Sequence, residues 1–182
     1  VKWSTKDDLL LFTTQKEGDF IFWTVSVDGN KVNRILDETS EVSDPIWSPK
    51  GDAIYYLQAQ GNMNNLMKIK IDRITGESLG KPITLISGLP ISGNVNGHIF
   101  RKNMSISETG KLVILSGKSE YSNLFSAELI SSPDSIFLKT KQLTEGTRSI
   151  NGFDTSPDGK LIAFSLNYGI KSVSIDDPKT YN

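Results

Sequence analysis

The sequence predicts an all-β chain built as a β-propeller, and two observations carry this prediction. A polar turn followed by an apolar strand occurs four times, with the copies opening at Trp3, Trp47, Ile106 and Thr155. Each copy is followed by further short segments that read as strands. Four antiparallel strands that repeat at intervals of roughly 40–50 residues are typical of a propeller blade.

The residue types of the repeated turn explain its conformation. In Ser156-Pro157-Asp158-Gly159-Lys160, proline presets its φ angle near about −65° and glycine supplies the positive φ that closes the turn. The copy at Trp47-Ser48-Pro49-Lys50-Gly51 has the same order of residues, whereas Ser107-Glu108-Thr109-Gly110 lacks the proline. The first copy has Asp7 at the glycine position, and aspartate tolerates the left-handed region better than most residues. Asp158 is therefore expected to be a turn residue, since Lys50 and Thr109 occupy its position in other copies.

Segments with apolar residues at every second position follow each turn and predict further strands. They span residues 22–28, 66–72, 124–129 and 170–176, and shorter apolar runs follow at 34–36, 82–86 and 141–144. No segment has helical periodicity of useful length. A sandwich or barrel is the alternative for many short strands, but their strands need not repeat in register as these do.

The repeats divide the chain into four blade units at approximately 1–41, 42–87, 88–146 and 147–182. The first unit opens near the end of its first strand, and the last stops before a fourth strand. We therefore expect about four blades, the first and last incomplete, that form part of a larger ring. The remaining blades, or other domains of the same protein, are expected partners.

Charge and composition narrow the classes of partner. The 20 basic and 21 acidic residues give a formal charge of −1, which leaves no electrostatic footprint for nucleic acid or an anionic membrane. No apolar run is long enough to cross a bilayer, so we expect a soluble segment without membrane insertion. The absence of cysteine excludes disulfides, thiolate chemistry and cysteine-bound zinc.

The repeated segment resembles that of the TolB-like propellers, whose repeat carries a Trp-Ser-Pro-Asp-Gly-Lys-x-Ile-Ala-Phe-type signature. Residues 156–164 match this signature, and residues 47–52 match it with Lys50 at the aspartate position. Residues 65–82 are similar to blades of sensor-type propellers, which are fused to bacterial kinases or regulators or lie in envelope proteins. The resemblance implies a sensor or envelope-associated subtype that senses a ligand or a protein, with a leaning towards the periplasm or another extracytoplasmic location. It supplies no catalytic residue.

Catalytic and metal-binding constellations are not predicted. His98 is the only histidine, so a histidine-rich metal site is excluded, and no Gly-x-Ser-x-Gly elbow presents a serine to it. This also argues against the propeller-type pectate-oligomer lyases, which the repeat resembles but which need several metal-binding histidines. The carboxylate pairs Asp7/Asp8, Glu38/Glu41 and Asp176/Asp177 fall in turns or loops, where such pairs are usually solvated. No cofactor is expected, and the calcium-like fragment at residues 28–30 is explained as a strand turn.

Loops between the second and third strands, and between successive blades, are the expected ligand face, because loops on a rigid scaffold often carry function. The candidates there are His98, Arg101, Tyr121, Arg148 and Asn151. The sequence thus predicts a non-enzymatic recognition, sensor or scaffold module of a larger bacterial protein, which binds a protein, peptide or glycan. Two alternatives stay open: the gating propeller of a prolyl-oligopeptidase-like serine peptidase, and a propeller that binds or cleaves glycans.

Overall fold

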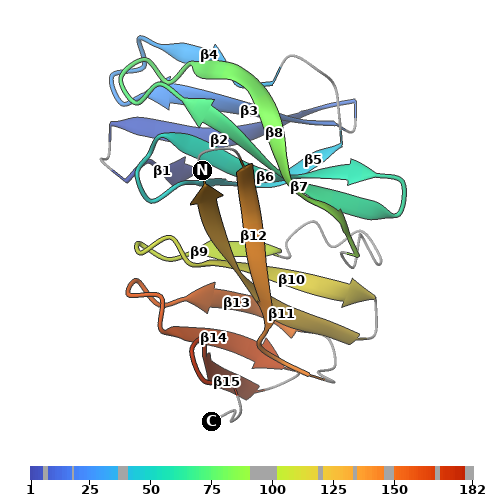
Figure 1. Cartoon of the computed structure of the whole chain (residues 1–182). Helices are drawn as coiled ribbons and strands as arrows, with labels where there is room; N and C mark the ends of the chain where they lie inside the picture. The colour runs from blue at the N-terminus through green and yellow to red at the C-terminus, as the bar shows by residue number, and fades with distance from the viewer. Residues whose placement is uncertain are drawn as a thin grey trace. The chain divides into compact units, whose positions relative to one another are not determined.

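The computed structural model describes residues 1–5, 8–17, 19–36, 41–90, 102–118, 121–132, 135–145, 150–166 and 169–178. These residues form strands and turns, and none of them is helical (Figure 1). The strands of the first half are β1 (Lys2–Trp3), β2 (Leu9–Lys16), β3 (Asp19–Ser26), β4 (Val32–Arg34), β5 (Val42–Trp47), β6 (Ala53–Gln60), β7 (Met63–Ile71) and β8 (Ser78–Leu89). Those of the second half are β9 (Met104–Ile106), β10 (Leu112–Lys118), β11 (Tyr121–Ser132), β12 (Ser135–Gln142), β13 (Ile150–Thr155), β14 (Leu161–Leu166) and β15 (Gly169–Ser174).

The strands form four separate antiparallel sheets, each a meander in which neighbours in the sequence are neighbours in the sheet. Their orders are β1-β2-β3-β4, β5-β6-β7-β8, β9-β10-β11-β12 and β13-β14-β15. We call these sheets blades 1 to 4 and their strands A to D. The prediction of an all-β chain of propeller blades is therefore confirmed, and the described part of blade 4 has strands A to C.

The chain divides into two compact units. Unit 1 covers Val1–Gly88 and contains blades 1 and 2, and unit 2 covers Leu89–Asn182 and contains blades 3 and 4. Each unit is therefore a pair of successive blades, and the two pairs can be compared with one another. Among the described residues, no helix is long or apolar enough to cross a membrane.

A serine organises the turn between strands A and B in every blade. The Ser48 backbone N–H donates to the Ala53 carbonyl at 2.8 Å, and the Ala53 N–H donates to Ser48 Oγ at 3.2 Å. The same pair of bonds joins Ser4 to Leu9 and Ser156 to Leu161, and in blade 3 it joins Ser107 to Lys111 over one residue fewer. The serine Oγ thus accepts a hydrogen bond from a backbone N–H at the start of strand B, where this buried donor needs a partner.

The glycines of these turns adopt the predicted conformation. Gly51, Gly110 and Gly159 have φ angles of 69°, 87° and 70°, whereas Asp7 lies outside the described residues. Asp158 accepts hydrogen bonds from Ser156 Oγ at 2.6 Å and from the Lys160 N–H at 3.0 Å. Asp158 therefore does stabilise its own turn, as the comparison of the copies indicates.

Within each unit, the A–B turns of the two blades lie against each other. A Cβ atom on Gly51 would come within 3.1 Å of Thr5 Oγ1, and one on Gly159 would come within 2.5 Å of Thr109 Oγ1. In unit 2 the Glu108 N–H also donates to the Pro157 carbonyl at 3.0 Å. Both glycines thus face a threonine hydroxyl of the preceding blade.

A second polar contact joins the outer strand of one blade to the C–D turn of the next. In unit 1, Thr24 Oγ1 donates to the Gly76 carbonyl at 2.6 Å and Asn33 Nδ2 donates to the Thr75 carbonyl at 2.7 Å. In unit 2, Lys141 Nζ donates to the carbonyls of Ile175 and Asp176 at 3.1 and 2.8 Å. In blade 1, Leu11, Thr24 and Asn33 lie side by side on strands B, C and D. In blade 3, Val113, Ser126 and Lys141 lie side by side in the same way, so Asn33 and Lys141 hold equivalent positions.

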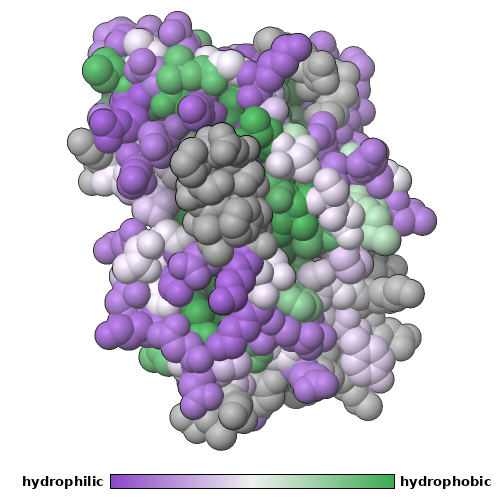
Figure 2. Space-filling view, in the orientation of Figure 1, coloured by the Kyte–Doolittle hydropathy of each residue, from purple (hydrophilic) through white to green (hydrophobic). Residues whose placement is uncertain are grey.

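Apolar side chains fill the space between the two blades of each unit. The unit 1 core contains Leu9, Leu11, Phe22, Ile35, Val42, Trp47, Ile54, Tyr56, Met67, Ile69 and Ile71. The unit 2 core contains Val113, Leu115, Leu124, Leu143, Ile150, Phe153, Ile162, Phe164, Val173 and Ile175. The aromatic residues Trp47 and Phe164 thus pack between blades, whereas Trp3, at the position of Trp47 in the first copy, is exposed. Figure 2 shows that the surface on view is mostly hydrophilic, with apolar residues in smaller areas.

Two glycine substitutions separate the cost of the turn conformation from the cost of blade packing. Gly110→Ala places a Cβ in open space, so we expect a loss of about 1 kcal/mol from its positive φ alone. Gly159→Ala has a similar φ but would also push its Cβ against Thr109 and Ser107, so we expect a further loss of about 1–3 kcal/mol. Urea unfolding of the two variants measures the difference, and equal losses would contradict the turn packing described above.

Candidate functional site

Two of the five predicted ligand-face residues lie in the described part of the chain. Tyr121 is the first residue of β11 and its side chain is 55% exposed, and Asn151 is an exposed residue of β13. His98, Arg101 and Arg148 lie outside the described residues. The site can therefore be built from Tyr121 and Asn151 and from the residues that support them.

The structure brings Tyr121 and Asn151 to the same end of unit 2. Ser122 follows Tyr121 and Ile150 precedes Asn151. The Ile150 N–H donates to Ser122 Oγ at 3.1 Å and so links the two strand starts. Tyr121 begins strand C of blade 3, and Asn151 lies near the start of strand A of blade 4. The B–C loop of one blade and the entry to the next blade thus meet at one end. We call Tyr121, Asn151 and their supporting residues Ser116, Gly117 and Ser122 the loop-end site.

The β10–β11 hairpin that carries Tyr121 is held closely at its base. Gly117 has a φ of 150°, and a Cβ on it would collide with the Tyr121 carbonyl. The Pro90 carbonyl accepts hydrogen bonds from the Gly117 N–H and from Ser116 Oγ, both at 2.7 Å. Three backbone segments therefore converge at Gly117, next to the exposed Tyr121.

Asn151 lies at an irregularity of strand A. The β13–β14 register shifts between Ile150 and Gly152, so Asn151 is the extra residue of a β-bulge. A similar shift in β5, between Ser43 and Ile46, includes Asp44 with a φ of 53°. Bulges reorient side chains and occur often beside binding sites. The bulge explains how an otherwise regular inner strand presents the amide of Asn151 at its end.

A polar cluster on the A strands of blades 3 and 4 was missed by the sequence reasoning. Asp154 Oδ1 accepts hydrogen bonds from Lys102 Nζ at 2.7 Å and from Ser105 Oγ at 2.5 Å. Ser105 is buried, and its Oγ also lies 2.8 Å from Thr155 Oγ1 and accepts from the Thr155 N–H at 3.2 Å. We call Lys102, Ser105, Asp154 and Thr155 the inner-strand cluster.

The signal that could have found this cluster is positional. Ser105 and Asp154 directly precede Ile106 and Thr155, at which the third and fourth copies open. The first strands of propeller blades surround the central channel, so polar residues there are candidates for ligand contact. The repeat comparison centred on the turn that follows and therefore passed over the strand before it.

Opposing influences act on the carboxyl group of Asp154. Partial burial raises its pKa, but the hydrogen bonds from Lys102 and Ser105 and the lysine charge outweigh burial and hold the pKa below its ordinary value. The group is therefore ionised at neutral pH and its side chain stays 69% exposed. It can accept hydrogen bonds from a ligand while it holds Ser105 and Lys102 in place.

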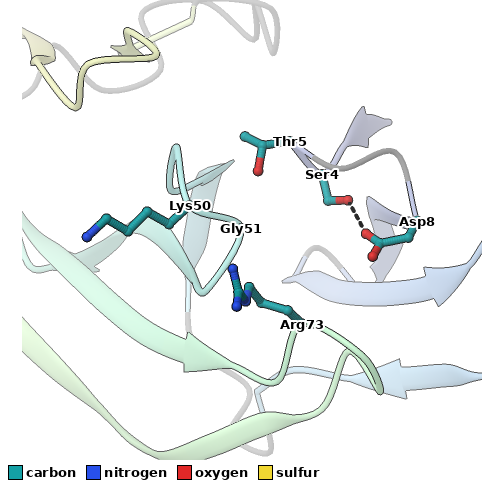
Figure 3. Close-up of a pocket in the computed structure, with 6 residues that line it drawn as sticks. All are labelled: Ser4, Thr5, Asp8, Lys50, Gly51 and Arg73. Carbon is teal, nitrogen blue, oxygen red and sulfur yellow. Dashed lines mark hydrogen bonds between the residues drawn. The ribbon is translucent and has the colours of Figure 1, made fainter.

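The small depression in unit 1 is too limited for an organic ligand. It has a volume of about 10 Å³ and is lined by Ser4, Thr5, Asp8, Lys50, Gly51 and Arg73, which is room for about one water molecule. Figure 3 shows Ser4 hydrogen-bonded to Asp8, and Lys50 extending away from the other side chains. The depression lies at the packed A–B turns, so we assign it to the turn contact and not to a binding site.

The described residues contain no group of three or more histidine, cysteine, aspartate or glutamate side chains placed to hold a metal ion. What the described sites offer is an aromatic ring, an amide, hydroxyl groups and one ion pair. Such groups hold a ligand by stacking and by hydrogen bonds.

Comparison with known proteins supports the blade architecture. No family model and no curated protein matches the chain. Among solved structures, a protein assigned as TolB from Agrobacterium tumefaciens has a TM-score of 0.67 at 18% identity, over 100% of this chain and 59% of that one. The blades of this chain therefore have the same fold as those of this TolB structure.

Two enzymes among the solved structures are also similar in fold, with lower TM-scores. The oligogalacturonate lyase of Vibrio parahaemolyticus has a TM-score of 0.64 at 10% identity, over 99% of this chain and 50% of that one. A gluconolactonase from Xanthomonas campestris has a TM-score of 0.53 at 11% identity, over 89% of this chain and 52% of that one. The chain thus spans half to three fifths of the length of these structures, and at such identities the likeness concerns the fold alone.

The inner-strand cluster makes a specific contribution to the pH dependence of stability. Because the pKa of Asp154 is lower in the folded chain, its contribution is fully present above the unfolded value near 3.8 and is lost as the pH falls through the folded pKa. Asp154→Asn should therefore cost about 0.5–1 kcal/mol at pH 6, a modest value because the ion pair is solvent-screened.

The cost of Asp154→Asn should be smaller at about pH 2.5 than at pH 6, as measured by urea unfolding at the two pH values. Glu108→Gln, at an exposed turn position of the same unit, is the charge-matched control. A cost for Asp154→Asn that is the same at both pH values would contradict the role of the ionised carboxylate.

Proposed function

We propose that the chain is a non-enzymatic recognition module, in a sensor or scaffold role, which binds a protein, peptide or glycan through the loop-end site of unit 2. The observation that carries the proposal is that two exposed residues, Tyr121 and Asn151, lie at the same end of unit 2, where the Ser122–Ile150 and Gly117–Pro90 hydrogen bonds hold the backbone. Exposed tyrosine is enriched among the residues that contribute most to binding surfaces.

Tyrosine suits this role for physical reasons. Its ring supplies a large apolar area with few rotatable bonds, so little conformational entropy is lost when a ligand covers it. Its hydroxyl and the Asn151 amide can donate to and accept from a peptide backbone or a sugar. Because hydrogen bonds already hold Ser116, Gly117 and Ser122, binding does not need to order these residues.

The inner-strand cluster extends the proposed recognition along the A strands. The exposed Asp154 carboxylate and the Lys102 ammonium offer one acceptor and one donor of opposite charge. Charged pairs of this kind favour ligands with complementary charges and contribute more to specificity than to affinity. A polar peptide segment or a sugar that carries both donors and acceptors fits both features.

The wider context belongs to the same proposal. The resemblance to TolB-like propellers supports a place in a larger bacterial protein outside the cytoplasm. The serine-peptidase alternative requires a second domain, because in such peptidases the propeller gates access to a separate hydrolase domain. A Gly-x-Ser-x-Gly elbow elsewhere in the same polypeptide would favour that alternative over the sensor role.

Peptide and glycan arrays probed with the chain test the proposal directly. We expect Tyr121→Ser to weaken the binding of any probe that the arrays identify at least about fivefold, as is usual for a central aromatic contact. Leu161→Ser removes an equally exposed apolar residue from strand B of blade 4, at the A–B turn end, and is the matched control. Equal binding by wild type and Tyr121→Ser, or equal losses for both variants, would rule out the loop-end site.

A further inference from the structure

Residue pairs in which glycine follows asparagine or aspartate can react with their own main chain. The glycine amide nitrogen attacks the side-chain carbonyl carbon of the preceding residue, and the approach is open because glycine has no Cβ. The described residues contain three such pairs, Asn151-Gly152, Asp28-Gly29 and Asp158-Gly159. A further pair, Asn96-Gly97, lies outside the described residues. The surroundings of each described pair decide whether it can react.

The two Asp–Gly pairs are fixed in tight turns. In Asp158-Gly159, the carboxylate accepts a hydrogen bond from the Lys160 N–H at 3.0 Å, and the Gly159 N–H donates to the Ser156 carbonyl at 2.9 Å. The pair Asp28-Gly29 makes the same two contacts, with Asn30 and Ser26 as the partners. In both pairs, the attacking nitrogen and the side chain are thus held by the turn, so we expect little reaction there.

Asn151 lies in a different environment. It is the extra residue of the bulge in β13, because Ile150 pairs with Leu166 and Gly152 pairs with the preceding residue of β14. Asn151 is exposed, and its side chain makes no hydrogen bond with the residues that the structure describes. The residue inserted in a bulge is unpaired and disrupts the ladder locally. The side chain of Asn151 is therefore free to turn towards the Gly152 nitrogen.

The strand on either side of Asn151 stays in place while this movement occurs. The Ile150 N–H is held by Ser122 Oγ at 3.1 Å, and the Gly152 carbonyl accepts from Ser165 Oγ at 3.4 Å. The next residue, Phe153, is buried in the unit 2 core. The reactive geometry therefore needs a local change at the bulge, and local openings of this kind require less free energy than unfolding of the unit.

We propose that Asn151 is a site of spontaneous deamidation in the folded chain. The Gly152 nitrogen forms a bond to Asn151 Cγ, and the bond between Cγ and Nδ2 breaks. The amide group leaves as ammonia and takes the proton that the Gly152 nitrogen gives up. A five-membered cyclic imide remains in the main chain. No oxidant or reductant takes part.

Water then opens the imide in one of two ways. Addition at the side-chain carbonyl gives aspartate, and addition at the main-chain carbonyl gives isoaspartate, in which the peptide continues through the former side chain. Either product adds a negative charge to the loop-end site at neutral pH. Isoaspartate also lengthens the main chain by one methylene group, at a residue without a partner in β14. The inference concerns the chemistry of the chain and does not depend on the proposed ligand binding.

Peptide mapping by mass spectrometry tests the proposal on the folded chain, incubated in mildly alkaline buffer. Asn151 should convert at least about tenfold faster than Asn33 and Asn65, which are hydrogen-bonded and precede larger residues. The rate should rise with pH, because the attacking nitrogen must lose its proton, and both aspartate and isoaspartate should form. Equal rates at the three asparagines, or aspartate as the single product, would overturn the proposal.

A glycine variant tests the route of the reaction. In Gly152→Ala the new Cβ has room, since its nearest neighbour would be Ser165 Oγ at 3.8 Å, so the variant should fold. The Cβ obstructs the attack, and conversion of Asn151 should slow about tenfold or more. Gly169→Ala, in the same sheet and with its nearest neighbour at 3.9 Å, is the matched control and should leave the rate unchanged. Unchanged conversion in Gly152→Ala would rule out the cyclic imide.

A destabilised variant distinguishes local reaction from reaction through unfolding. Gly110→Ala lowers the stability of the same unit at a turn far along the sequence from Asn151, and it should raise the unfolded population about fivefold. Conversion through global unfolding would become faster by the same factor. We expect the rate at Asn151 to stay the same, because the local movement at the bulge does not need unfolding. A fivefold faster conversion in Gly110→Ala would contradict a reaction of the folded chain.

Discussion

In each unit, two neighbouring blades meet where the A–B turn of one lies against the A–B turn of the next, and the rest of the structure depends on this contact. Each A–B turn has a serine that serves both strand ends, and in blades 2, 3 and 4 it also has a glycine with positive φ. At Gly51 and Gly159 the missing side chain has a second role, because it leaves room for a threonine hydroxyl of the preceding blade. One residue type thus sets both the turn and the distance between blades.

The contact between A–B turns holds the two blades of a pair together at one end. A second contact, made by the outer strands, holds them together at their outer edge. Asn33 in unit 1 and Lys141 in unit 2 hold the same register position and bind the C–D turn of the following blade. The side chain differs while the acceptors remain backbone carbonyls, so either residue can supply the donor. With both contacts in place, the apolar faces between the blades are held at packing distance, and burial of these faces provides most of the stability.

The two described sites arise where the regular repeat is modified. Asn151 is displaced by a bulge, Tyr121 follows a tightly held hairpin, and the inner-strand cluster joins polar side chains of two successive A strands. These modifications lie on strands whose positions are set by the turns and cores, so the groups that could contact a ligand are held rigidly.

The sequence by itself determined the blade architecture, because turn chemistry and alternating strands are local properties that four copies repeat with small changes. It also named Tyr121 and Asn151 as ligand-face candidates, which stays a prediction, and the structure places them at the starts of β11 and β13. Only the tertiary structure decided which residues meet: Lys102 and Ser105 reach Asp154 from another blade. Trp3 and Trp47 show the same division, because identical positions in the repeat have opposite exposure, which depends on whether another blade lies against them.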